Sequence, residues 1–327
     1  MTLRVVYFGS SQTVFSRRFY EALSRASCDI VAIVDVPPAK RSSTNAAKDD
    51  GNSDYPREAA RRSIPVYEPD NPNLPEFVET LRSLKPDLFL AVGYMFRLKA
   101  EILAVPRIVS ANVHASLLPA YRGRSPVFWA LRHGEPYSGL TIHSMDDRLD
   151  TGDLLYQVRV RTRKDDTVSS LYARIIDRGV KLVPRLIADA ERGRLPRKSQ
   201  AGAPGSYFSA AKEANFRVDW SRSSEELRRW VVTTPGQCFI DIRANRLFLQ
   251  DARIAANPKR AAPGTLLRVA SAGCTIAAGG SALRIVMVRP SSGEPMPISD
   301  FCRQLGLSVG DCIIDSVARE TSPKEVC

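Results

Sequence analysis

The sequence predicts a Rossmann-like α/β domain followed by a small OB-like β-barrel domain, and three observations support this. A chain of 327 residues is long enough for about two domains. Residues 3–8 and 30–34 are apolar runs separated by a helix-like segment at 15–24, as in the first βαβ unit of a parallel sheet. After residue 205 the pattern changes to short alternating stretches interrupted by Gly and Pro, which is typical of small β domains.

The other elements of the first domain continue this alternation of strands and helices. Helical periodicity appears at 74–84, at 126–132 and at 167–191, where Pro184 should kink or break the helix. Residues 37–55 are polar and rich in Ser, Asn, Asp and Lys, so we expect a long exposed loop there. Further strands are expected at 88–93, 108–113, 140–145 and 154–160.

A change of composition marks the domain boundary. Residues 192–205 are rich in Pro, Gly, Arg and Lys, as expected of a linker. We therefore place the first domain at 1–191 and the OB-like domain at 206–314, with one clear helix at 225–232. The polar tail at 315–327 is expected to be mobile.

Composition narrows the possible partners and compartments. The formal net charge of +12 can favour polyanionic partners such as tRNA, although a chain that simply uses much Arg would read the same way. No apolar run is long enough to span a membrane. The N-terminus reads as a first strand rather than a signal peptide. The six Cys form no Cys-x-x-Cys pair and no metal-ligand cluster is visible, so we expect no metal, reduced thiols and a cytoplasmic location.

The chemistry-bearing residues gather between positions 112 and 155. Asn112 and His114 lie two apart at the end of a predicted strand, so both side chains point to one face of the sheet. Asp150 follows the predicted strand at 140–145, and a loop there can return its carboxylate to the imidazole. His143 lies on that strand, and we expect it to be a core or supporting residue.

These three residue types suit acyl transfer to an amine. A neutral His can act as a general base, a nearby carboxylate orients its ring, and an Asn amide can donate to a developing oxyanion. No Ser or Cys occupies a nucleophile elbow, which favours direct transfer over a covalent acyl-enzyme. The structural alternative is that Asn112 caps a turn, His114 is a satisfied core histidine and Asp150 begins a turn.

The order of motifs resembles the formyltransferases that use 10-formyltetrahydrofolate. In that family an Asn-x-His pair precedes Ser-Leu-Leu-Pro and Arg-Gly, and a later Asp precedes x-Gly. Here the same order falls on Asn112 and His114, on 116–119, on Arg122-Gly123, and on Asp150 to Gly152. The resemblance covers nearly the whole chain, including the order of elements in the C-terminal domain.

The resemblance implies a formyl donor and its pocket. The donor would be 10-formyltetrahydrofolate, with Asn112, His114 and Asp150 as catalytic residues. The pocket would be shaped by the loop after the strand at 88–93, by the Ser-Leu-Leu-Pro turn and by the residues just before Asp150. The positions concerned are Phe96, Arg97, Leu98, Ser116, Leu117, Leu118, Pro119, Asp146, Asp147, Arg148 and Leu149.

The acceptor follows less directly. In methionyl-tRNA formyltransferases a basic segment containing Gly-Arg-Gly follows the second strand and meets tRNA, whereas residues 36–43 here lack it and keep only Lys40 and Arg41. Residues 67–73 and 121–126 are similar to the amino-sugar branch. We therefore favour a small-molecule amine, such as a nucleotide-linked amino sugar or a specialised-metabolite amine, with methionyl-tRNA as the main alternative.

Two further alternatives remain at this point. A formyltetrahydrofolate hydrolase would result if water replaced the amine. A non-catalytic RNA-binding module is compatible with the basic charge and the OB-like domain, although the intact Asn112, His114 and Asp150 favour an enzyme. The sequence does not indicate an oligomeric state.

Overall fold

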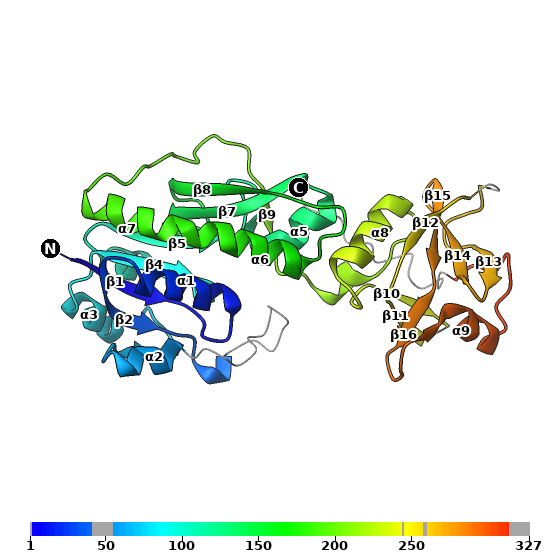
Figure 1. Cartoon of the computed structure of the whole chain (residues 1–327), viewed down its shortest axis with the longest axis horizontal. Helices are drawn as coiled ribbons and strands as arrows, with labels where there is room; N and C mark the ends of the chain where they lie inside the picture. Colours follow the sequence, from blue (N-terminus) through cyan, green and yellow to red (C-terminus); the bar gives the residue numbers. More distant parts are fainter. Residues whose placement is uncertain (1, 41–54, 244, 258–259, 314–327) are drawn as a thin grey trace. The chain divides into compact units, whose positions relative to one another are not determined.

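A computed structural model describes residues 2–40, 55–243, 245–257 and 260–313 (Figure 1). Most of the loop expected at 37–55, and the whole tail expected at 315–327, fall outside these residues. The chain forms two compact units. The first contains Met1–Pro126, Tyr137–Arg161 and Tyr172–Phe208, and the second contains Val127–Pro136, Thr162–Leu171 and Ser209–Cys327.

A seven-stranded sheet forms the centre of the first unit, in the order β3-β2-β1-β4-β5-β7-β8. The strands from β3 to β5 in that order are parallel, and β7 and β8 are antiparallel to their neighbours. The Rossmann-like α/β prediction is therefore confirmed. The strands are β1 (Leu3–Phe8), β2 (Cys28–Val34), β3 (Val66–Tyr67), β4 (Leu88–Val92), β5 (Val109–His114), β7 (Tyr137–Ser144) and β8 (Leu154–Arg161).

Helices connect and flank these strands (Figure 1). The first begins where Thr13 accepts a hydrogen bond from the backbone N–H of Ser16, a side-chain N-cap. The break expected at Pro184 is also present, because this residue lies in the first turn of a new helix, where a missing N–H costs nothing. The elements are α1 (Val14–Ser24), η1 (Pro38–Lys40), α2 (Tyr55–Arg61), α3 (Pro75–Ser83), α4 (Ala100–Leu103), α6 (Val168–Gly179), η2 (Val180–Leu182) and α7 (Val183–Glu191).

The apolar runs of the sequence become the central strands of this sheet. All five residues of β4 are buried, and Phe8 on β1 packs against Phe89 with ring centroids 5.0 Å apart. Burying such side chains contributes roughly 1.5–3 kcal/mol each. The carboxyl ends of the parallel strands are thus held on a rigid base, which is where open α/β sheets carry their ligand sites.

The pairing of β5 with β7 brings separate parts of the sequence together. In this antiparallel ladder Asn112 lies opposite His143, and His114 lies opposite Thr141. Gly139 allows β7 to pack closely, since a Cβ there would lie 2.1 Å from the carbonyl oxygen of Val158. A larger residue at 139 would push β7 off its neighbour and alter the register at the site.

The second unit contains two four-stranded antiparallel sheets, in the orders β10-β11-β16-β17 and β12-β15-β14-β13. The small β domain predicted for this part of the chain is confirmed, and the structure shows that its sheets are antiparallel. The helix predicted at 225–232 is α8 (Ser224–Thr233), which begins with a capping box formed by Ser223 and Glu226. The strands are β10 (Phe239–Ile242), β11 (Asn245–Leu249), β12 (Arg253–Ala255), β13 (Leu266–Ala270), β14 (Gly273–Ala278), β15 (Ser281–Ile285), β16 (Met287–Pro290) and β17 (Met296–Pro297).

A single apolar core supports this unit. It includes Trp220, Trp230 and Leu247, and residues from both sheets. The remaining elements are α5 (Pro126–His133), η3 (Glu213–Phe216) and α9 (Ile298–Gln304). None of the helices in the described parts of the chain has both the length and the apolar character needed to cross a membrane.

The segment predicted as a linker has its own contacts within the first unit. Leu154 and Lys198 exchange two backbone hydrogen bonds of 2.8 and 3.0 Å. A short strand, β9 (Tyr207–Phe208), pairs with β6 (Arg122–Gly123). Residues 192–208 therefore belong to the first compact unit, whereas the sequence placed a boundary at 191.

Candidate active site

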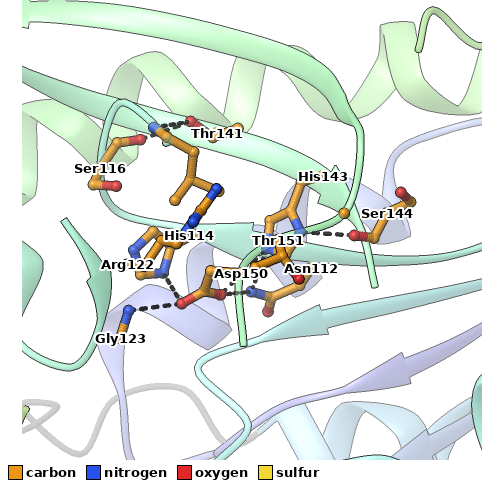
Figure 2. Close-up of polar contacts among 12 residues, drawn as sticks. Asn112, His114, Ser116, Arg122, Gly123, Thr141, His143, Ser144, Asp150 and Thr151 are labelled. Atoms are coloured by element: carbon orange, nitrogen blue, oxygen red, sulfur yellow. Dashed lines mark hydrogen bonds and ion pairs between the residues drawn. The ribbon is translucent and has the colours of Figure 1, made fainter. Parts of the chain in front are cut away.

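The end of β5 carries the two candidate residues expected there. Asn112 and His114 lie on one face of the strand, and both approach Asp150 (Figure 2). Only 7% of His114 and 8% of Asp150 is exposed. The structure therefore brings together the three residues that the spacing singled out.

His114 is held at both ring nitrogens. Its Nε2 lies 2.8 Å from the carbonyl oxygen of Tyr121, and its Nδ1 lies 3.6 Å from Oδ2 of Asp150. A carbonyl oxygen only accepts hydrogen bonds, so Nε2 carries the hydrogen. A second proton is then taken up at Nδ1, facing the carboxylate. Burial lowers the pKa of His114 below its usual 6.5, and Asp150 and the Tyr121 carbonyl offset this only in part.

Asp150 lies in a strained turn. Its φ of +56° is in the left-handed region, which non-glycine residues seldom occupy. The backbone N–H of Gly123 donates to Oδ2 at 2.8 Å. Burial raises the pKa of the carboxyl, but contact with His143, the charge of His114 and the Gly123 N–H outweigh it and bring the pKa to about 2. The carboxylate is therefore ionised at neutral pH.

His143 lies beside this group and is 2% exposed, in agreement with the core or supporting position expected for it. Its Nδ1 lies 2.7 Å from the Ser144 carbonyl and so carries a hydrogen. Its Nε2 lies 3.1 Å from Nδ2 of Asn112 and 3.4 Å from Oδ1 of Asp150. A neutral ring accepts from Asn112, whereas a protonated ring donates to Asp150. Strand pairing produces these contacts, since His143 lies opposite Asn112 in the β5–β7 ladder.

The chemistry of these neighbours also orients the Asn112 amide. Nδ2 of Asn112 lies 3.4 Å from Oδ1 of Asp150, and a carboxylate oxygen only accepts. The NH₂ group must therefore face Asp150 and His143. Donation to a substrate oxygen requires one of its two hydrogens, and the longer contact, to Asp150, is the weaker one to give up.

The Ser-Leu-Leu-Pro turn begins two residues after His114, and side chains of β7 and β8 hold its backbone in place. Thr141 donates to the carbonyl of Ser116 at 2.7 Å, and its own oxygen accepts from the backbone N–H of Leu118 at 3.2 Å. Gln157 donates to the Leu118 carbonyl at 3.0 Å. Ser116 and Leu118 are buried, while Leu117 and Pro119 are partly exposed. This turn can meet a ligand mainly through its backbone and Leu117 or Pro119.

Two other loops named from the sequence are joined to each other. Arg97 donates to the backbone carbonyl of Asp147. Phe96 is half-buried and Leu98 is buried, so the open positions of the first loop are Arg97 and the neighbouring Met95, which is 42% exposed.

The second loop is more open. Asp147 and Arg148 are exposed, and Leu149 is 55% exposed. Asp146 accepts from the Arg148 N–H at 3.1 Å and from the Thr151 hydroxyl at 2.7 Å, so its side chain shapes the turn. Exposed apolar side chains on joined loops can cover the face of a flat ring.

Sequence reasoning missed the residues whose side chain or backbone completes the site from elsewhere. Gln200, in the segment predicted as a linker, donates to the carbonyls of Asp150 and Gly152. The Tyr121 carbonyl and Gly123 N–H carry no side-chain signal at all. In the described part of the chain, no three or more His, Cys, Asp or Glu side chains are grouped to hold a metal ion.

The arrangement can accept a proton and stabilise the cation that results. A buried imidazole is paired with a carboxylate that stays charged, and an amide lies beside both. This combination, at the strand ends of a Rossmann-like sheet, is typical of α/β enzymes that transfer acyl groups.

Comparison with known sequences gives the family. Residues 3–187 match the formyl transferase family model, and residues 211–306 match the model for the C-terminal domain of formyl transferases. A methionyl-tRNA formyltransferase of Pseudomonas syringae pv. tomato is 31% identical over 91% of this chain and 94% of its own length. One of Acidithiobacillus ferrooxidans is 32% identical over 95% and 98%.

The chain therefore belongs to the formyl transferase family. It is an enzyme that transfers a formyl group from 10-formyltetrahydrofolate. Among solved structures, an N-formyltransferase from Helicobacter canadensis has the same fold, with a TM-score of 0.62 at 16% identity over 87% of this chain and 99% of that chain.

Proposed function

We propose that the protein formylates the primary amine of a small molecule, with Asn112, His114 and Asp150 as its catalytic residues. The amine nitrogen attacks the formyl carbon, the bond from that carbon to the folate nitrogen breaks, and one amine proton passes to the leaving nitrogen. The observation that carries the residue roles is the buried imidazole 3.6 Å from an ionised carboxylate.

Each of the three residues has a distinct part in this proposal. His114 takes the amine proton at Nδ1, its ring nitrogen without a hydrogen, and the imidazolium is then held by Asp150 and the Tyr121 carbonyl. Asn112 turns one Nδ2 hydrogen from Asp150 to the formyl oxygen as negative charge develops there. Both contributions are greater in the transition state than in the ground state, which is what accelerates a reaction.

For the donor, we propose a pocket formed by the three loops around these residues. Met95, Arg97 and Leu149 offer exposed surface beside backbone groups, which suits the flat ring of a folate. Phe96, Leu98, Ser116 and Leu118 would act mainly by setting the backbone, because their side chains are buried or half-buried. Leu117, Pro119, Asp146, Asp147 and Arg148 complete the proposed lining.

The pH dependence of turnover tests the role of His114. A general base must be neutral, so the rate should rise with pH through an apparent pKa below 6.5 and be close to its plateau at neutral pH. The Asp150 carboxylate raises the pKa of His114, so Asp150→Asn should move this acidic limb to still lower pH. Measuring kcat at saturating amine from about pH 5 to pH 8 tests this, because kcat/KM would also contain the ionisation of the free amine. A limb above 6.5, or one unmoved by Asp150→Asn, would contradict the assignment.

The preference for a small amine rests on how the nearby cations are used. Lys40 Nζ donates to the Asp70 carbonyl at 2.7 Å and lies 3.2 Å from its carboxylate. Arg97 donates to a backbone carbonyl, and Arg122 donates to Gln200 at 3.0 Å. Each of these three cations already has a hydrogen-bond partner within the protein. This supports an acceptor that needs only a pocket beside the formyl group.

Methionyl-tRNA is the second candidate, and one surface of the second unit favours it. Arg253 lies opposite Arg284, which lies opposite Thr275, which in turn lies opposite Arg268. The three arginines therefore form a row across one face of this sheet. They make no ion pair with any residue that the structure describes. Like charges directly opposite each other are unfavourable, and a phosphate backbone would relieve this repulsion.

Salt dependence separates the two acceptors. With a small amine, kcat/KM should fall only modestly between about 50 and 200 mM salt, because few charges are screened. The assay would offer 10-formyltetrahydrofolate with a panel of amino sugars, nucleotide-linked amino sugars and methionyl-tRNA, and would detect the formylated product by mass. Efficient formylation of methionyl-tRNA that falls steeply with salt, and falls again in Arg284→Glu, would replace the first candidate by the second.

A further inference from the structure

The segment from Lys198 to Phe208 crosses the site and is fastened at both ends. Lys198 exchanges backbone hydrogen bonds with Leu154, and β9 pairs with β6. Between these two attachments the side chain of Gln200 is 4% exposed. A buried glutamine must place both a donor and an acceptor, so its partners define what it does.

Three contacts account for both ends of the Gln200 amide. Nε2 lies 3.0 Å from the Asp150 carbonyl and 2.6 Å from the Gly152 carbonyl. Oε1 lies 3.0 Å from Nη2 of Arg122. Carbonyls only accept and a guanidinium only donates, so the orientation of this amide is fixed by its neighbours. The two Nε2 hydrogens are therefore donated to two carbonyls of the same turn, at residues 150–152.

The turn at residues 150–152 has a strained backbone, and contacts such as those of Gln200 are required to hold it. Asp150 has a φ of +56°, a conformation that costs of order 1–3 kcal/mol and persists only when surrounding contacts enforce it. Gly152 lies so close to β7 that a Cβ would be 1.9 Å from the Ser144 carbonyl. The turn is therefore held against β7 on one side and by Gln200 on the other. A shift in either would rotate the carboxylate relative to His114.

We propose that Gln200 is a positioning residue that holds the Asp150 turn in the conformation aiming the carboxylate at His114. This inference rests on the proposed role of Asp150. Gln200 acts through the backbone carbonyls of Asp150 and Gly152, and its contact with Arg122 holds the amide in register. The segment predicted as a linker is thus part of the site.

Two substitutions separate these contacts. Gln200→Ala removes all three hydrogen bonds, whereas Gln200→Glu keeps an acceptor for Arg122 and loses both donors. Both should lower kcat by about ten- to hundredfold, because small misplacements of a catalytic group have effects of that size. KM for 10-formyltetrahydrofolate should change little. Ser199→Ala is the matched control, since the side chain of this exposed neighbour accepts a hydrogen bond from the Ala201 N–H and not from the Asp150 turn, and the variant should keep parental activity.

A double-mutant cycle distinguishes positioning from general support of the fold. In an Asp150→Asn background, Gln200→Ala should cause little further loss, because the group it positions is already disabled. Multiplied losses, or a fully active Gln200→Glu, would overturn the inference. If Gln200→Ala does not fold, the cycle is run with Gln200→Glu. Full activity of Asp150→Asn alone would instead refute the proposed catalytic role, so the two failures are told apart.

Discussion

His114→Ala should lower kcat by a hundredfold or more, since a positioned general base typically contributes about 10²–10⁴-fold. The variant loses the group proposed to accept the amine proton beside the Asp150 carboxylate. The donor should still bind, because His114 is not part of the lining proposed for the donor pocket. Single-turnover formylation rates, with donor binding measured by fluorescence or calorimetry, give the two quantities separately.

A matched variant controls for the loss of an imidazole. His133→Ala removes an exposed histidine at the end of α5, stacked on Trp129, and should leave turnover near the parental value. Circular dichroism and thermal unfolding must show that His114→Ala is folded, since its ring is buried. Near-normal turnover in a folded His114→Ala would refute the assignment of the base.

Asp150→Asn should also reduce kcat by a hundredfold or more, because replacing the carboxylate that orients a catalytic His typically costs up to about 10⁴-fold. The substitution preserves size, and the new amide oxygen can still accept from the Gly123 N–H. What it removes is the negative charge facing the His114 cation. KM for the amine should change less than kcat, because the charge matters most once the proton has moved. Steady-state kinetics at the pH plateau measure both.

Asp153→Asn is the corresponding control. Asp153 lies three residues further on, and its carboxylate lies 3.7 Å from Arg197 in a partly exposed ion pair. Such pairs are worth about 0–1 kcal/mol, so this variant should be stable and active. Equal losses in Asp150→Asn and Asp153→Asn would indicate a nonspecific effect of charge on the turn and would contradict an orienting role for Asp150.

Local sequence patterns predicted the elements whose burial is continuous or periodic. The apolar runs of β1 and β4 are buried as expected, and Pro184 breaks the helix where the missing N–H requires it. The spacing of Asn112 and His114 placed both on one face, because side chains on a strand alternate. These features depend on neighbours in the sequence.

The linker segment and the short helix α4 show what local sequence patterns could not predict. Composition identified residues 192–205 as a linker because Pro, Gly and charge are common in exposed chain. Lys198 contacts Leu154, 44 positions earlier in the chain, and Gln200 contacts Asp150, 50 positions earlier, and no local sequence pattern indicates either contact. Helix α4 was also not predicted, because its 4 residues are too few to show helical periodicity in the sequence.

The sequence by itself indicated the fold class and placed Asn112 and His114 on one face of a strand, because strand period and apolar patterning depend on residues near one another in the chain. The resemblance of its motif order to a known family implied formyl transfer. The tertiary structure alone decided which atoms meet. Strand pairing places His143 opposite Asn112. The turn at Asp150, with its positive φ, brings the carboxylate close to His114. Gln200 contacts this turn from a segment 50 residues away in the sequence. Backbone donors and acceptors such as the Gly123 N–H and the Tyr121 carbonyl are common to every residue type, so only the folded chain assigns them a place.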